Sequence, residues 1–92
     1  VQTDPRDPRV ATAYFTLGRV ERSRGRDAAA AAAFEVSLAR APHGALAEDA
    51  LAEAAMSWAS AGRPDRARAT ARRYLELHPA GLYADRVRHL AE

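Results

Sequence analysis

The chain has 92 residues, with 24 alanines, no cysteine, and 14 arginines against 12 acidic residues, for a formal net charge of +2. This length fits one small domain, and the alanine content favours helix. The lack of cysteine excludes disulfides, thiolate catalysis and cysteine-based zinc sites. No apolar run is long enough to cross a membrane, and no signal peptide is visible.

The first predicted helix spans residues 8–24. Asp7 can cap its free N–H groups, and Pro8 suits a first helical position. Gly25 can end it in the left-handed conformation. Residues 1–6 are polar, and we expect an extended lead-in. Because the chain begins at Val1 rather than at Met, we expect it to be an excised or processed part of a longer protein. Spacings of three and four predict one buried stripe on this helix: Val10, Ala13, Tyr14, Leu17 and Val20.

A second helix is predicted over residues 28–41, with Asp27 as its cap. Its alanine run, residues 28–33, raises helix propensity and also lets two helix backbones approach closely. The helix must end at Pro42, which opens a joint with His43 and Gly44. Its predicted buried face consists of Ala30, Ala33, Phe34, Leu38 and Ala41.

Three more helices are predicted, over residues 45–61, 64–78 and 82–91. Gly62 and Pro64 mark the turn between the first two of these, and Pro79 marks a second joint. Trp58 lies on the packing face of the third helix, so we expect it to be largely buried. The last helix is amphipathic and would shield the end of the chain.

The proline and glycine signals recur with a period of 37 residues. Pro5, Pro42 and Pro79 coincide in this register, as do Gly25 with Gly62, Ala30 with Ala67, and Leu38 with Leu75. A fixed period of this length is typical of stacked repeats. We therefore predict one all-α domain over residues 1–92, with repeats at about 5–41 and 42–78 and a capping helix at 79–92.

These helix pairs resemble tetratricopeptide repeats, whose unit has aromatic, Leu-Gly, turn-glycine, alanine, aromatic and closing-proline positions. Glu21 departs from this pattern where the first copy should have its second aromatic residue, and Ala71 replaces a Phe in the second copy. The resemblance implies a TPR-like α-α superhelix. The matching positions are Tyr14, Leu17-Gly18, Gly25, Ala30, Phe34 and Pro42 in the first copy, and Leu51, Ala54-Ala55, Trp58, Gly62, Ala67, Tyr74 and Pro79 in the second.

The joints beginning at Pro42 and Pro79 resemble repeats of bacterial cell-envelope proteins. Such repeats occur in Tol-Pal accessory proteins, in outer-membrane assembly factors, and as extensions on FecR-like anti-sigma regulators. This similarity favours a periplasmic or envelope-associated location over the cytoplasm.

The resemblance also implies a non-catalytic protein–protein interaction module. Its inner groove would hold a peptide, a helix or a sister subunit. Phe15 and Met56 lie off the predicted packing stripes, so they either capture a partner or are covered by the capping helix or a neighbouring domain. The expected groove residues are Thr12, Phe15, Thr16, Arg19, Arg22, Asp49, Glu53, Met56, Arg86 and His89.

The sequence carries no recognisable catalytic or metal-binding constellation. His43, His78 and His89 lack the i, i+4 pairing of a helical metal site, and no serine lies in a Gly-x-Ser-x-Gly context. We therefore expect no enzyme activity, no metal and no cofactor.

The alternative function is binding of nucleic acid or another anionic partner. Six arginines would form its basic surface, although a solvated outer helix face accounts for them more simply. We also expect a homodimer through the first helix, where apolar side chains around Val10, Tyr14 and Phe15 would lie exposed. The six arginines are Arg66, Arg68, Arg72, Arg73, Arg86 and Arg88.

Overall fold

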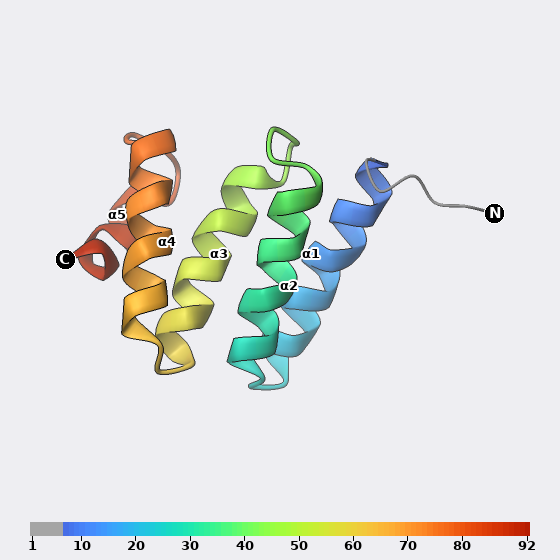
Figure 1. Cartoon of the computed structure of the whole chain (residues 1–92), viewed down its shortest axis with the longest axis horizontal. Coiled ribbons are helices and arrows are strands. Elements are labelled where there is room, and N and C mark those ends of the chain that lie inside the picture. The colour runs from blue at the N-terminus through green and yellow to red at the C-terminus, as the bar shows by residue number, and fades with distance from the viewer. Residues whose placement is uncertain (1–6) are drawn as a thin grey trace.

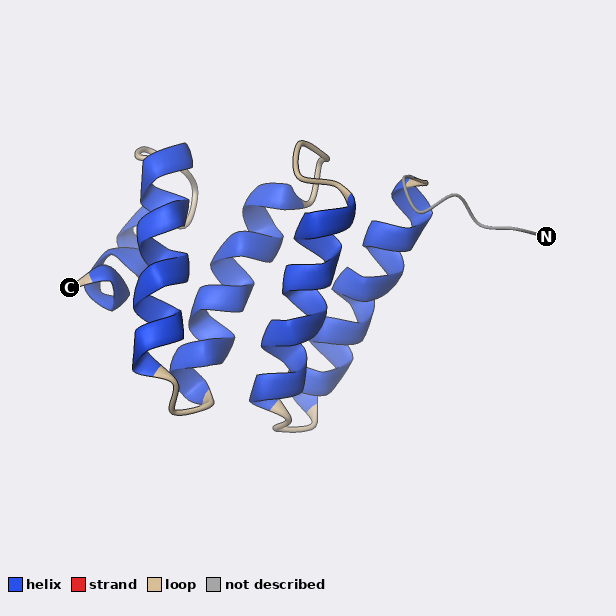
Figure 2. Cartoon of the chain, in the orientation of Figure 1, coloured by secondary structure: helices blue, strands red, loops and turns tan. Residues whose placement is uncertain are grey.

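The computed structural model describes residues 7–92, which are all-helical and contain no strand (Figures 1 and 2). The predicted all-α class is therefore confirmed. The predicted lead-in over residues 1–6, and with it the start of the first predicted repeat, lies outside the described residues. The elements are α1 (Pro8–Ser23), α2 (Asp27–Arg40), α3 (Ala47–Ser60), α4 (Pro64–Leu77), α5 (Ala84–Arg88) and the 3-10 helix η1 (His89–Ala91).

The start of α1 follows the sequence prediction. The Asp7 carboxylate accepts a hydrogen bond of 2.9 Å from the Arg9 backbone N–H, and Pro8 is the first helical residue. Hydrogen bonds from the Arg9 side chain, and after them the one from its backbone N–H, lower the pKa of Asp7. At α2 the predicted cap is wrong by one position: Asp27 is the first helical residue, and Arg26 precedes it without a side-chain cap.

The two helix–helix turns have the same backbone geometry. Gly25 and Gly62 adopt φ angles of 75° and 74°, in the left-handed region that favours glycine. The next residues, Arg26 and Arg63, have ψ angles of 69° and 71°. Each donates its backbone N–H over 2.9 Å to the residue five positions earlier. The turn after α1 thus recurs after α3, at a spacing of 37 residues.

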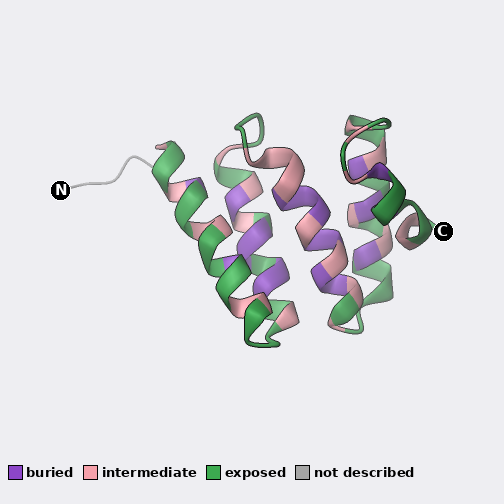
Figure 3. Ribbon diagram, turned by 180° about the vertical axis from the view of Figure 1, so that it is seen from behind, coloured by how far each residue is buried: buried purple, intermediate pink, exposed green. Residues whose placement is uncertain are grey.

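The helices pack in chain order, each against the next one. Helices α1, α3 and α5 lie on one side of the molecule, and α2 and α4 lie on the other (Figures 1 and 3). The core between them is built largely from alanine, so the helix backbones approach closely. Trp58 is only 5% exposed, which confirms its predicted burial.

The buried stripe predicted for α1 is wrong. Leu17 and Val20 are 47% and 38% exposed, and Ala13 is exposed as well, whereas Ala11 and Gly18 are buried. Helix α1 turns its small residues toward α2, where the Phe34 ring lies against Gly18. The other side of α1 faces no described element, so its apolar residues stay exposed (Figure 3).

The end of the chain is shorter and less regular than the single helix predicted over residues 82–91. It begins two residues later, at Ala84, and its last turn is the 3-10 helix η1. Arg68 and Arg72 on α4 hold this end by donating from Nε to the carbonyl oxygens of Glu92 and Ala91. Val87 is fully buried against the α3–α4 core.

Candidate interaction site

A hollow of about 400 Å³ opens on the side of the molecule formed by α1, α3 and α5. Side chains from four elements surround it, although the elements are far apart in sequence. We call it the odd-helix groove. It is lined by Arg22, Glu53, Met56, Ala59, Ser60, Arg86, His89 and Leu90.

The groove combines an apolar surface with a charged rim. Met56 and Leu90 are partly buried against the main core and supply the apolar part. At the rim, the Arg22 guanidinium donates to the Glu53 carboxylate over 2.6 Å, which ties α1 to α3. Because Arg22 and Glu53 neutralise each other, Arg86 is left as the cationic side chain at the rim of the groove.

A second hollow of about 270 Å³ adjoins the groove and is lined by Arg19, Arg22, Ser23 and Glu53. Six of the ten predicted groove residues line one or both hollows. These are Arg19, Arg22, Glu53, Met56, Arg86 and His89.

Phe15, also predicted to lie in the groove, lines neither hollow. Its ring packs edge-on against Phe34, with centroids 5.3 Å apart, beside Ala30 and Ala54. The glycine at position 18 leaves the space that Phe34 fills, so the two phenylalanine rings can meet. Phe15 is therefore a partly buried core residue.

Three further predicted residues lie away from the two hollows. Thr12 is exposed and donates its hydroxyl to the Pro8 carbonyl oxygen over 3.1 Å. Thr16 is exposed too and lines neither hollow. Asp49 lies beside Tyr83, where its carboxylate, together with partial burial, raises the pKa of the Tyr83 hydroxyl.

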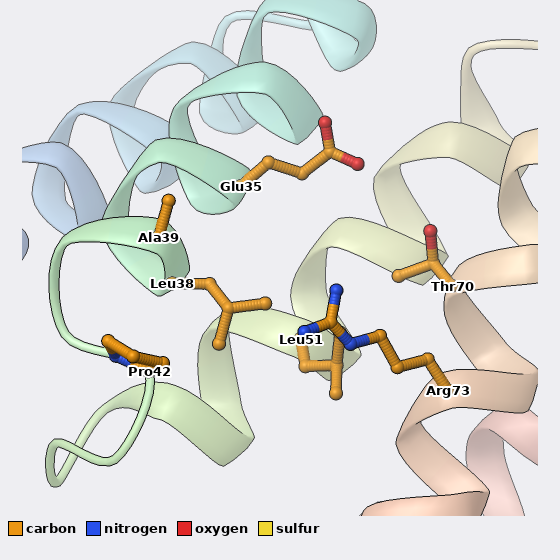
Figure 4. Close-up of a pocket in the computed structure, with 7 residues that line it drawn as sticks. All are labelled: Glu35, Leu38, Ala39, Pro42, Leu51, Thr70 and Arg73. Carbon is orange, nitrogen blue, oxygen red and sulfur yellow. The ribbon is translucent and has the colours of Figure 1, made fainter.

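Sequence reasoning missed a trough on the opposite side of the molecule, between α2 and α4. Its first cavity, of about 250 Å³, is shown in Figure 4. A second cavity, of about 470 Å³, shares Leu38, Pro42 and Arg73 with the first. We call the two together the even-helix trough. A signal was present in the sequence, because Arg66, Thr70, Arg73 and Leu77 recur at spacings of four, three and four and so share one face of α4.

The histidines do not gather into a cluster. His43 and His78 line the second cavity of the trough, and His89 lies in the odd-helix groove. His78 Nδ1 is 3.8 Å from the Glu48 carboxylate. Within residues 7–92, no group of three or more His, Cys, Asp or Glu side chains forms a candidate metal site.

The arginines proposed as a basic surface mostly have partners within the molecule. Arg68 and Arg72 donate to carbonyl oxygens at the end of the chain, and Arg88 pairs with Asp85 over 2.7 Å. The Arg66 guanidinium lies 4.8 Å from the centroid of the Trp58 ring. Since Arg73 lines the even-helix trough and Arg86 the odd-helix groove, the six arginines are spread over several surfaces.

No protein-family model, curated protein or solved structure matches this chain. Among residues 7–92, no helix has the length and apolar character that a membrane span requires.

Proposed function

We propose that this chain is a non-catalytic protein interaction module built from two TPR-like repeats and a capping helix. Support comes from hydrogen bonds that occupy equal places in the 37-residue register. The Ser37 hydroxyl donates to the Ala11 carbonyl oxygen over 2.7 Å. Tyr74 and Glu48, which are 37 positions further on, are joined by a hydrogen bond of the same length.

The odd-helix groove is the proposed partner site. The observation that carries this proposal is the convergence of α1, α3, α5 and η1 on one hollow with an apolar surface and a charged rim. Met56 is flexible and polarisable, so it adapts to an apolar side chain of a partner. Arg86 favours an acidic group beside that side chain. A peptide, a helix or a sister subunit with this pairing would fit.

The wider setting that we propose is a larger bacterial protein of the cell envelope or of signal regulation. This setting rests on the resemblance of two joints to repeats of bacterial cell-envelope proteins. The joints begin at Pro42 and Pro79, and in each a glycine follows the proline by two residues. The complete gene product and its chromosomal neighbours would test this setting directly.

Selection of a partner peptide tests the groove. The immobilised chain would be used to enrich peptides from a random display library, and an enriched peptide would then be titrated in solution. We expect Met56→Glu to weaken its binding at least about tenfold, because the carboxylate removes the apolar contact and repels the acidic group expected on the partner. Leu82→Glu is the matched control, since Leu82 is 83% exposed and lies outside the groove. Equal affinity of the wild type and Met56→Glu would contradict the groove assignment.

The nucleic-acid alternative has less support. Four of its six arginines make contacts within the molecule, and the net charge is only +2. Phosphate binding would show a steep loss of affinity with rising salt, whereas binding at Met56 would not. The salt dependence of any binding therefore separates the two functions.

A homodimer through α1 is the second part of the proposal. An exposed stripe on α1 consists of Ala13, Leu17 and Val20. The residues 37 positions further on are fully buried on α3; they are Ala50, Ala54 and Ser57. The same register positions are thus covered on α3 and uncovered on α1. Two copies pairing by a two-fold axis would cover this stripe on both.

A further inference from the structure

The even-helix trough runs along α3, between α2 and α4. Because each helix is antiparallel to the next, α2 and α4 run in the same direction and form its two walls (Figure 1). At one end the trough is closed: the Trp58 indole N–H donates to Glu35 over 3.0 Å, and Arg66 lies over the same ring. Beyond this closure the two cavities follow one after the other.

The first cavity has an apolar base. Leu38 from α2 and Leu51 from α3 meet there, and Arg73 from α4 projects over them (Figure 4). Its volume of about 250 Å³ is below the usual range for drug-sized ligands, so it fits a single large side chain. The second cavity continues past Arg73 to Ala47 and Leu77, and Leu77 is 58% exposed.

Arg73 is the charged group of the trough that lacks a partner among residues 7–92. Glu35 accepts from Trp58, and Glu48 accepts from the Tyr74 hydroxyl and from the Leu82 backbone N–H. The structure shows no hydrogen bond or ion pair for Arg73 within that range. A guanidinium over an apolar base favours an acidic group that lies next to an apolar side chain.

Along its base and its α4 wall, the trough offers side chains and no free backbone groups. Leu51 and Arg73 lie in the interiors of α3 and α4, where the N–H and C=O groups bond within the helix. A strand would find nothing here to pair with its own backbone, whereas a helix satisfies its backbone internally. The geometry thus favours a helical occupant.

We propose that the even-helix trough binds an amphipathic helix of a partner protein. One large aliphatic side chain of that helix enters the cavity over Leu38 and Leu51. A second, one turn away, lies against Leu77, and an acidic residue between them pairs with Arg73. Leu51 and Ala47 are one helical turn apart, about 6 Å, which matches the i to i+4 spacing of the two anchors. This site is separate from the odd-helix groove, so the molecule would hold two partners on opposite sides.

A helical probe peptide of roughly 14 residues, stapled because an isolated helix of that length is marginal in water, tests the trough. It carries leucines at positions 5 and 9 and a glutamate at position 8. One companion peptide has both leucines replaced by alanine, and another has the glutamate replaced by lysine. Binding to the isotope-labelled full chain is followed by NMR, where the single tryptophan gives a unique indole N–H signal.

We expect the leucine–glutamate peptide to shift the Trp58 indole signal and the methyl signals of Leu38 and Leu51. The alanine peptide should not bind. Arg73→Glu should weaken binding of the glutamate peptide about tenfold and favour the lysine peptide instead. Arg40→Glu is the matched control, because Arg40 is exposed on α2 and lines neither cavity. The affinity of this variant for the glutamate peptide should stay within about twofold of the wild-type value.

Two results would overturn the inference. One is an absence of shifts at Leu38 and Leu51 up to millimolar peptide. The other is an unchanged preference for glutamate over lysine in Arg73→Glu. Shifts confined to Met56 and His89 are a case of the first result and would support the odd-helix groove instead, so the two sites succeed or fail independently.

Discussion

The Tyr74 hydroxyl joins α4, α3 and the segment that leads into α5. It donates to the Glu48 carboxylate over 2.7 Å and accepts from the Tyr83 backbone N–H over 2.8 Å. Glu48 also accepts from the Leu82 backbone N–H, and these hydrogen bonds, the one from Tyr74 foremost, lower its pKa. A Cβ at Gly81 would collide with the Tyr74 oxygen, so the joint needs glycine there. One buried phenol thus fixes the path of the chain into its last helix.

Alkaline pH should weaken this joint. Burial, and after it the Glu48 carboxylate, raise the pKa of Tyr74 to about 12. A tyrosine whose folded pKa lies above its ordinary value of about 10 stabilises the fold fully below pH 10 and loses that contribution as the pH rises through 12. We expect the ionisation of Tyr74 to lower the free energy of unfolding by about 2 kcal/mol between pH 8 and pH 12. Urea unfolding at several pH values in this range would measure the fall.

Tyr74→Phe should flatten this alkaline decline. At neutral pH the same variant should cost about 1–2 kcal/mol, because Glu48 and the Tyr83 N–H each lose a partner. Tyr14→Phe is the control, since the structure shows no hydrogen bond from the Tyr14 hydroxyl within residues 7–92. A decline as steep in Tyr74→Phe as in the wild type would show that another group is responsible.

The two helix pairs fill the same register positions with different side chains. In the α1–α2 pair, Gly18 faces Phe34, and the Phe15 ring packs on Phe34 in turn. In the α3–α4 pair, the residues 37 positions further on are Ala55 and Ala71, both fully buried. The α1–α2 pair therefore packs a glycine against a phenylalanine, whereas the α3–α4 pair has alanine at both of the corresponding positions.

Gly18→Ala tests this fit at the level of the helix pair. A Cβ at position 18 would lie 2.7 Å from the Phe34 ring, which is fully buried. Overpacking of this kind costs roughly 1–3 kcal/mol, against about 1 kcal/mol gained in helix propensity. We expect a net loss of about 1 kcal/mol in urea unfolding.

The same substitution in a Phe34→Leu background should reverse sign. Leucine vacates the space that the Cβ needs, so the propensity gain of up to about 1 kcal/mol should then dominate. If Gly18→Ala stabilises the wild type, the close approach of α1 and α2 is not limited by Phe34.

The extent to which these elements could be predicted differs along the chain. The positions of the helices could be predicted from local signals, because each helix boundary depends on the residue that stands there. These residues include Asp7, Pro8, Gly25 and Pro42. The burial of Trp58 followed from its place on a helix with neighbours on both sides. The burial pattern of α1 could not be found in this way, since periodicity marks the apolar face of a helix without saying on which side its neighbour lies.

Tertiary context also decided the candidate site. Arg22 and Glu53 are 31 positions apart, and their side chains meet only because α1 and α3 lie on the same side of the molecule. The repeat register assigned both residues to one predicted groove but did not pair them. The packing of Phe15 on Phe34 could not be predicted, because Phe34 fills a space that exists only above Gly18. The even-helix trough went unnoticed because its Arg73 was weighed as part of a charge run and not by what lies beneath it.

The two ends of the whole molecule are unlike. Helix α4 is covered by α5 and η1, whereas the far side of α1 has no neighbour within residues 7–92. The exposed stripe of Ala13, Leu17 and Val20 consequently belongs to one end only. A second copy can cover it by pairing α1 with α1, but not by stacking on the closed end.

Weak dimerisation through α1 is the expected result. One helix face buries less than the roughly 1,200 Å² of a stable interface, so we expect a Kd on the order of 0.1–1 mM. Sedimentation velocity at several concentrations would measure it. Leu17→Glu should abolish the dimer, and Leu82→Glu, an equally polar change at an exposed leucine elsewhere, should not. A strict monomer at high micromolar concentration, or a dimer that tolerates Leu17→Glu, would contradict this interface.

The order in which the helices contact one another also affects how the chain folds. Because each helix packs mainly against the next, most contacts are short in sequence, and the entropy lost in closing loops is small. Folding can therefore start at either helix pair and spread along the chain. Helices α5 and η1 together make fewer contacts with the rest of the fold than α1 makes with α2, so opening at the C-terminal end disturbs the fewest contacts. The molecule should therefore loosen first at α5 and η1, and the odd-helix groove should lose its Arg86 and His89 wall before its Arg22 wall.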